Sequence, residues 1–328
     1  MTVSHHSHSG EFCLHAKGTL AEVVEEAIRQ GFTTFGLSEH VPRYKREHLY
    51  PEEEHLEPED LATTFSRYLD EAHRLKALCS DRITLLVGLE TEYIDKSGLD
   101  RLERLLETER TRIDYIVGSV HHCDGLPIDF DQTGFDRVVA QQGGGSTTQD
   151  ERLESLFSTY FDNQLELVNR LKPEVIGHID LCRLYYPDID FRRFPSIWAK
   201  ILRNIDAAVA YGALFELNAS AFRKGWKTGY PGAEVFDAIL SRGGRFTLSD
   251  DSHGPQAVGL HYDRAYEYLE DRGVRELWYL APKPSMSQSG DLKQGFVRQV
   301  EARRIDGTPW RKEWPALFEA TRQQPVAR

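Results

Sequence analysis

Residues 4–15 read Ser-His-His-Ser-His-Ser-Gly-Glu-Phe-Cys-Leu-His, and residues 2–8 are predicted to form the first strand. On an extended chain the side chains of His6 and His8 point to the same side, because successive side chains alternate. Neutral imidazole is the commonest protein ligand for metals such as zinc, iron and manganese. An expression tag would be an uninterrupted histidine run, whereas Ser, Gly and apolar residues interrupt this one. The stretch therefore predicts half of a metal site at the end of a strand.

The rest of the chain alternates predicted strands with predicted helices. Further strands are expected at residues 33–40, 83–90, 114–121, 174–180, 213–218, 246–250 and 277–280. Helices are expected at residues 20–30, 60–79, 99–109, 151–171, 194–211, 233–241 and 261–271. This alternation is typical of βαβ units and a parallel sheet, and seven or eight units favour a closed α/β barrel. Residues 43–59 and 123–149 are predicted loops, and residues 292–303 form an amphipathic stretch that fits no single element.

Composition limits the function. The 328 residues carry a formal net charge of −12, and so acidic a chain does not attract a phosphate backbone, which argues against bulk nucleic-acid binding. No apolar run approaches the ~20 residues of a membrane span, and the N-terminus lacks a secretory signal. The four cysteines show no CxxC spacing, which indicates a reducing compartment, and we expect a cytoplasmic protein. An anionic substrate would need metals or a local cationic cluster to bind to so acidic a chain.

Ligand-type side chains recur at the predicted strand ends. These residues are His8, His40, Glu90, His121, His178, Asn218 and the pair Asp250-Asp251. Barrel enzymes keep their active sites at that end of the barrel, and histidines with carboxylates suit zinc, iron(II) or manganese. So many candidates favour a centre of two or three ions, bridged by a carboxylate such as Glu90, which could clamp a phosphoryl group. The chain has neither a glycine-rich phosphate loop nor a GxSxG motif.

The order of these motifs resembles the polymerase-and-histidinol-phosphatase (PHP) superfamily, in particular the fungal-type histidinol-phosphatase branch. The motifs are His6-x-His8, Phe12-Cys13-Leu14-His15, Ser38-Glu39-His40, Gly88-Leu89-Glu90, Gly118-Ser119-Val120-His121-His122, Gly177-His178-Ile179-Asp180 and Ser249-Asp250-Asp251-Ser252-His253. The resemblance implies a distorted (β/α)7 TIM-like barrel over residues 1–282. Residues 283–328 would be a C-terminal extension packed on the barrel or trailing from it. The resemblance also implies metal-dependent hydrolysis of L-histidinol phosphate to L-histidinol in histidine biosynthesis.

The resemblance further implies three divalent transition metals, zinc, manganese or iron. The ligands implied for the first metal are His6, His8, Glu90 and Asp251, those for the second are Glu90, His121 and His178, and those for the third are His15, His40 and His253. The family's Asp-x-His spacing selects Asp251, and Asp250 would then stand behind it. The chain departs from many relatives at Ser4, where they carry an aspartate, which leaves the metal preference open.

Most of the remaining site residues are chosen from their places at or just after the ends of the fifth and sixth predicted strands, residues 174–180 and 213–218. Arg183 and Arg223 could hold the phosphate in bidentate contacts, with Asn218, Ser220 and Lys224 as further substrate-binding residues. Asp180 and His253 are the predicted catalytic side chains, with Asp180 either protonating the leaving alkoxide or orienting a histidine. The expected partner is a small-molecule phosphate ester, and the chain is expected to be a monomer or a homodimer.

Three other functions remain open. The first is a phosphoesterase of the same superfamily acting on another phosphomonoester or on phosphotyrosine. The second is a metal-dependent amidohydrolase, which usually relies on a carboxylated lysine at a strand end, and no predicted strand here ends in lysine. The third is a non-catalytic metal-binding or proofreading module. The full ligand set argues against lost catalysis, and the acidic surface argues against DNA.

Overall fold

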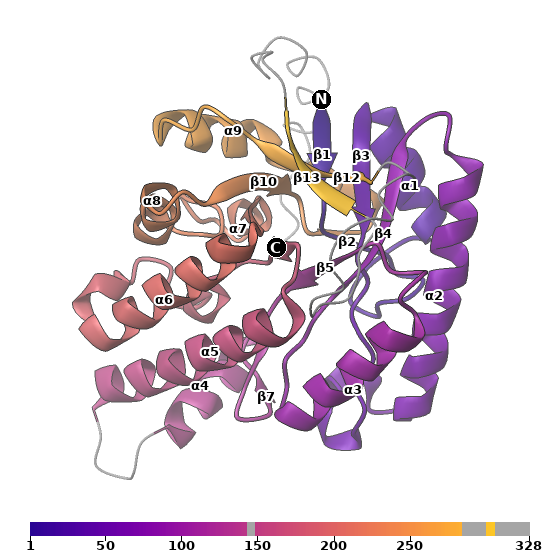
Figure 1. The fold of residues 1–328 in the computed structure, drawn as a ribbon. Helices are drawn as coiled ribbons and strands as arrows, with labels where there is room; N and C mark the ends of the chain where they lie inside the picture. The colour runs from indigo at the N-terminus through magenta and orange to yellow at the C-terminus, as the bar shows by residue number, and fades with distance from the viewer. Residues whose placement is uncertain (143–147, 284–299, 306–328) are drawn as a thin grey trace.

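The computed structural model describes residues 1–142, 148–283 and 300–305 (Figure 1). Seven strands form one sheet in the order β1-β3-β4-β5-β8-β9-β10, and every neighbouring pair is parallel. The strands are β1 Thr2–Ser4, β3 Phe32–Leu37, β4 Thr84–Glu90, β5 Tyr115–Gly118, β8 Val175–Ile176, β9 Leu214–Asn218 and β10 Arg245–Ser249. The sheet curves until its first and last strands meet, where Ser4 Oγ donates to Asp250 Oδ1 at 2.9 Å. The predicted seven-stranded barrel is confirmed.

The helices surround the sheet (Figure 1). They are α1 Leu20–Arg29, α2 Pro58–Leu78, α3 Lys96–Thr108, α5 Gln149–Leu171, α6 Pro195–Tyr211, α8 Ala233–Ser241 and α9 Tyr262–Asp271. α1 shows why they form: Thr19 and Glu22 make a reciprocal capping box that satisfies free N–H groups of the first turn. One face of α1 then packs into the core through four buried residues, Leu20, Val23, Val24 and Ala27.

The segment 123–149 was predicted as a loop, and this was wrong. It contains the hairpin β6 His122–Cys123 with β7 Leu126–Pro127, followed by α4 Gln132–Gln141. Asp131 caps the N-terminus of α4. The apolar face of α4 consists of only three buried residues, Phe135, Val138 and Val139, and the neighbouring glycines and polar residues make this short helical pattern hard to detect in the sequence. The Gly143-Gly144-Gly145 run of this segment lies outside the described residues.

Short helical turns fill several other connections. These are the 3₁₀ turns η1 Arg46–His48, η2 Pro51–Glu53, η3 Leu181–Arg183, η4 Phe191–Arg193 and η5 Pro255–Ala257, together with the single-turn α7 Ser220–Arg223. The first strand is also shorter than predicted. It breaks after Ser4, and Ser7–His8 form the separate strand β2, which pairs in parallel with β11 Ser252–His253.

A two-stranded ribbon closes the barrel at the N-terminal ends of its strands. β12 Trp278–Pro282 pairs antiparallel with β13 Val300–Arg304, and the ribbon crosses the sheet in Figure 1. Leu280 and Val300 pack with side chains inside the barrel, namely Leu86, Tyr115, Val117, Val175 and Leu214. Residues 284–299 and 306–328 lie outside the described residues, so the division at residue 282 stays a prediction.

Tyr115 lies across the barrel interior, between the β12–β13 ribbon and the open end of the barrel. A Cβ at Gly36 or Gly88 would collide with its ring, so the two glycines let the phenol cross the barrel interior. Its hydroxyl donates to the His5 carbonyl at 2.8 Å, which fixes the backbone just before His6. Within the described residues, no helix has both the length and the apolar character needed to cross a membrane.

Candidate metal centre

Glu90, the last residue of β4, is the hub of the site. Its Oε1 lies 3.0 Å from His6 Nε2, 3.0 Å from His178 Nε2 and 3.3 Å from His121 Nε2. Its Oε2 lies 3.3 Å from His8 Nε2 and 3.1 Å from His40 Nδ1. Burial opposes the ionisation of Glu90, yet His6, His121 and His40 hold its pKa well below the usual value. One carboxylate therefore contacts five imidazoles that come from four different segments of the chain.

The donor atoms fit metal ions. His6 Nδ1 bonds to Glu216 Oε2 at 3.0 Å, so with that nitrogen as the donor the lone pair of Nε2 faces Glu90. Two acceptors at this distance need a proton or a cation between them, and the Nε2 atoms of His6, His8 and His40 are buried without hydrogen-bond partners among the described residues. Ligands bound at ~2.0–2.2 Å to one ion lie roughly 3.0–3.5 Å apart, which matches the contacts around Glu90.

The structure brings together all nine side chains that the sequence singled out as ligands. Asp251 Oδ1 lies 3.7 Å from the Nε2 atoms of both His6 and His8, and His121 Nε2 lies 3.3 Å from His178 Nε2. The ligand atoms of His15, His40 and His253 form a further group at the outer side, all within 4.8 Å of one another. Cys13 belongs to that same group, with its Sγ 3.1 Å from His15 Nε2.

A ring of carboxylates behind the histidines was missed by the sequence analysis. Glu216 contacts His6 Nδ1, Glu39 Oε2 lies 3.5 Å from His8 Nδ1, and Glu92 Oε2 lies 3.3 Å from His121 Nδ1. Glu92 also lies 2.9 Å from His40 Nδ1, the nitrogen that faces Glu90. Such partners fix the orientation of a ligating imidazole and raise its basicity. Glu216 could have been found, since it stands two residues before Asn218 on one strand and so shares its face. Glu92 likewise stands two residues after Glu90.

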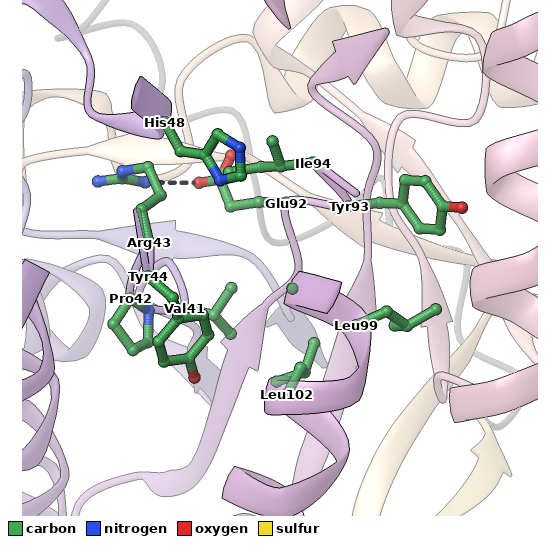
Figure 2. Close-up of a pocket in the computed structure, with 11 residues that line it drawn as sticks. Val41, Pro42, Arg43, Tyr44, His48, Glu92, Tyr93, Ile94, Leu99 and Leu102 are labelled. Carbon is green, nitrogen blue, oxygen red and sulfur yellow. Dashed lines mark hydrogen bonds and ion pairs between the residues drawn. The ribbon is translucent and has the colours of Figure 1, made fainter. Parts of the chain in front are cut away.

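Arg43 lies on the outer side of these carboxylates and pairs with one of them, Glu92. Figure 2 shows its guanidinium reaching Glu92, and the two are joined by a 3.0 Å ion pair. The same guanidinium pairs with Glu53, and Tyr50 Oη donates to Glu92 at 3.3 Å. Burial opposes the charge on Glu92, but His121 and His40 keep its pKa well below the usual value. Glu92 is therefore held as a carboxylate between a buried arginine and two histidines.

Asp251, rather than Asp250, turns toward the histidines. Its backbone has φ +47°, a left-handed conformation that Asp adopts more readily than most residues. The side chains of Asn218 and Ser220 donate to its Oδ2 at 3.2 and 3.1 Å, and Arg223 Nη2 donates to its carbonyl at 2.9 Å. These contacts hold the strained residue in place.

Asp250 points away from the histidines toward the seam of the barrel. It accepts hydrogen bonds from Ser4 Oγ at 2.9 Å and from Gly259 N at 2.7 Å. Burial raises the pKa of Asp250 to about 6. A second carboxylate at position 4 would face Asp250 directly, so the serine that departs from the family pattern fits its surroundings here.

A cavity of about 280 Å³ opens over the centre. Arg223, Lys224 and His253 line it together with Glu90 and most of the other candidate ligands. The remaining predicted substrate-binding residues do not line this cavity. Asn218 and Ser220 are fully buried and donate hydrogen bonds to Asp251, so in this structure they position a candidate metal ligand and do not face the substrate cavity.

Arg183 and Asp180 are also directed elsewhere. Arg183 Nη1 pairs with Glu234 at 2.7 Å and Nη2 donates to the Pro187 carbonyl at 2.8 Å. Asp180 Oδ2 accepts from Gly232 N at 2.8 Å, and burial raises the pKa of Asp180 to about 6. Both side chains therefore tie the segment after β8 to the start of α8 and do not line the cavity, so this arrangement gives no support to their predicted roles in phosphate binding and proton transfer.

A parallel barrel with a buried histidine–carboxylate centre at the C-terminal ends of its strands defines the class of metal-binding barrel hydrolases. Residues 4–220 match the family model described as "PHP domain". The chain belongs to this family.

Named relatives agree with that membership. The chain is 46% identical over 287 residues to a protein of Schizosaccharomyces pombe named "Probable histidinol-phosphatase", covering 87% of this chain and 91% of the relative. It is 32% identical over 311 residues to the histidinol-phosphatase of Saccharomyces cerevisiae, covering 84% and 90% of the two chains.

A solved structure shares the fold. The histidinol phosphate phosphatase of Lactococcus lactis, crystallised with zinc, L-histidinol and phosphate, superimposes with a TM-score of 0.61 at 20% sequence identity. The match covers 84% of this chain and 95% of that one.

Proposed function

We propose that this chain is a histidinol-phosphatase, which hydrolyses L-histidinol phosphate to L-histidinol and phosphate. The observation that carries the proposal is the Glu90 centre at the base of a cavity whose wall holds Arg223 and Lys224. Names of relatives at 46% and 32% identity over most of the chain support the same substrate. The rival phosphomonoesterases of the same family share the centre, so only the substrate separates them from this proposal.

The centre would hold two or three divalent ions, which we propose to be zinc, manganese or iron. The residues that would hold them are His6, His8, His15, His40, Glu90, His121, His178, Asp251 and His253. Bound ions supply Lewis acidity and make water nucleophilic at neutral pH. Glu216, Glu39 and Glu92 orient the imidazoles of His6, His8 and His121.

The cationic side of the cavity serves the phosphate. Arg223 spends one of its five N–H donors on the Asp251 carbonyl, which aims the guanidinium while leaving donors for phosphate oxygens. Lys224 Nζ contacts Tyr230 Oη at 3.3 Å and adds a second positive charge at the same wall. His253 lines the cavity and remains the predicted catalytic side chain. A cytoplasmic location and a monomeric or homodimeric state also stay predictions.

A substrate panel tests the proposal. Purified, metal-analysed protein is assayed for phosphate release from L-histidinol phosphate, phosphotyrosine and several unrelated phosphomonoesters. We expect kcat/KM for L-histidinol phosphate to exceed every other value at least tenfold. A His121→Ala preparation made in parallel controls for contaminating phosphatases. Equal or higher kcat/KM for another ester would replace the proposed substrate by that ester.

A further inference from the structure

The substrate in the proposed function carries both an anionic and a cationic group, and the inference below rests on that function. L-Histidinol phosphate has its phosphate on C1, a primary ammonium group on the neighbouring carbon C2, and an imidazole on C3. The centre with Arg223 and Lys224 accounts for the phosphate group. A binding site for the ammonium group needs an anionic or acceptor group that faces the same cavity and is not already neutralised.

Asp129 has these properties. It lines the cavity with His121, His178 and Lys224, in the segment between β7 and α4. Its Oδ1 is buried and has no hydrogen-bond partner among the described residues. Burial raises the pKa of Asp129, as expected for a carboxylate without a cationic partner in contact. Buried polar atoms in native proteins are nearly always paired with protein, water or a bound molecule, so this oxygen is an acceptor available to a group in the cavity.

The segment that carries Asp129 is firmly held against the centre. Ile128 N donates to the carbonyl of His121 at 2.9 Å, one residue before Asp129. The hairpin of β6 and β7 that precedes it begins at His122, directly after the candidate ligand. The backbone next to Asp129 is therefore fixed relative to His121, which limits where the carboxylate can lie, as a specificity residue requires.

The other carboxylates in the cavity wall are already engaged. Glu90 faces five imidazoles, and Asp251 is held by Asn218, Ser220 and the histidines around it. Lys224 is near Asp129, but the hydrogen bond of its Nζ goes to Tyr230. Among the carboxylates that line this cavity, Asp129 is the one for which the described part of the chain supplies no hydrogen bond or ion pair.

An aromatic pair stands next to Asp129. The rings of Phe130 and Tyr50 are stacked, with centroids 5.9 Å apart and an interplanar angle of 23°, and both line the cavity. Phe130 is 43% exposed, which is unusual for so large an apolar side chain. Tyr50 is fixed by its hydrogen bond to Glu92. The pair offers a flat face on which an imidazole or imidazolium ring can stack.

We propose that Asp129 binds the ammonium group of the substrate, with Phe130 and Tyr50 against its imidazole, so that this enzyme selects phosphomonoesters of amino alcohols. The phosphate then lies at the centre and the cation lies at the β7–α4 segment. Asp129 takes no part in the chemistry at phosphorus. It determines which alcohol is positioned there.

The test compares substrates that differ only in the ammonium group. For wild type and Asp129→Asn, kcat/KM is measured on L-histidinol phosphate and on its deaminated analogue, 3-(imidazol-4-yl)propyl phosphate. We expect the wild-type preference for the ammonium substrate to fall at least tenfold in the variant. Binding of the product L-histidinol to the metal-loaded protein, measured by calorimetry, should weaken by a similar factor. Asp136→Asn is the matched control, since Asp136 is an exposed carboxylate on α4 outside the cavity.

Three results would overturn the inference: a wild type that does not prefer the ammonium substrate, an Asp129→Asn variant with an unchanged preference, or an equal effect of Asp136→Asn. A pair of smaller esters, 2-aminoethyl phosphate and ethyl phosphate, reads out the same preference independently. If L-histidinol phosphate is not hydrolysed, the proposed function fails, while this second pair still decides the role of Asp129. Phe130→Ala alters an exposed side chain and should raise KM for L-histidinol phosphate more than for 2-aminoethyl phosphate.

Discussion

Replacing Arg223 by alanine should lower kcat/KM for L-histidinol phosphate by roughly two orders of magnitude. The guanidinium lines the cavity and uses one donor on the Asp251 carbonyl at 2.9 Å, so a two-pronged contact to phosphate remains available. Charge-assisted hydrogen bonds contribute about 1.5–3 kcal/mol each, and the open cavity argues for the lower end. Two such bonds give about 3 kcal/mol, or a factor of ~10², since ~1.4 kcal/mol is tenfold.

The metal content should not change in this variant. The carboxylate of Asp251 is held by Asn218 and Ser220, and Arg223 touches only the backbone carbonyl of that residue. Elemental analysis of both proteins therefore separates a loss of phosphate binding from a loss of ions. Arg223→Lys should recover part of the activity, because a lysine keeps the positive charge but cannot make two parallel hydrogen bonds to the phosphate as a guanidinium does.

The assay is steady-state phosphate release at several substrate concentrations, with KM expected to rise. Arg192→Ala is the matched control: Arg192 is an exposed arginine that pairs with Asp190 on the surface, and its loss should change kcat/KM less than twofold. Near-wild-type kinetics for Arg223→Ala would refute the reasoning and leave Lys224 as the cation at the phosphate. Loss of bound metal in the variant would refute the assignment of the Asp251 carboxylate to its two side-chain donors.

Three further outcomes are expected. After repletion with zinc, manganese and iron, elemental analysis should find two to three transition metals per chain, and at most one would contradict the ligand groups described here. His121→Ala should lose at least ~10²-fold in kcat with a melting temperature close to wild type, whereas activity within about threefold would remove His121 from the centre. Glu216→Gln removes the charged partner of His6 Nδ1 and should weaken metal retention against a chelator about 10–100-fold, with the exposed Glu107→Gln as control. Equal retention in the two variants would show that Glu216 does not tune the site.

Strand–helix alternation was enough to predict the barrel, and the strand-end residues indicated a metal centre. The set of nine candidate ligands that the structure brings together came from the resemblance of the motifs to the PHP superfamily. Parallel strands place their carboxyl ends at one edge, so spacing within each motif sufficed for His6, His8 and Glu90. The orientations of residues after the strands could not be predicted in this way. Asp251 adopts a left-handed backbone, and Arg183 lies in a 3₁₀ turn that directs it to Glu234.

The missed features have different physical reasons. Each outer carboxylate meets a histidine from another strand, and such a pairing depends on barrel curvature rather than on sequence spacing. Helix α4 was missed because its apolar face has only three buried residues and lies beside a glycine run. Asp129 gave no signal at all, since a single acidic residue in a connection has no periodicity to detect.

The centre draws its side chains from nearly the whole length of the barrel, from His6 to His253, and the seam between β1 and β10 is joined at Ser4 and Asp250. During synthesis a ribosome delivers His6 first and Asp251 and His253 last, after all seven strands of the sheet. Until the last strand emerges, the nascent sheet has an open edge and its early histidines lack their partners. Metal uptake by the full donor set is therefore a step that follows translation of the barrel.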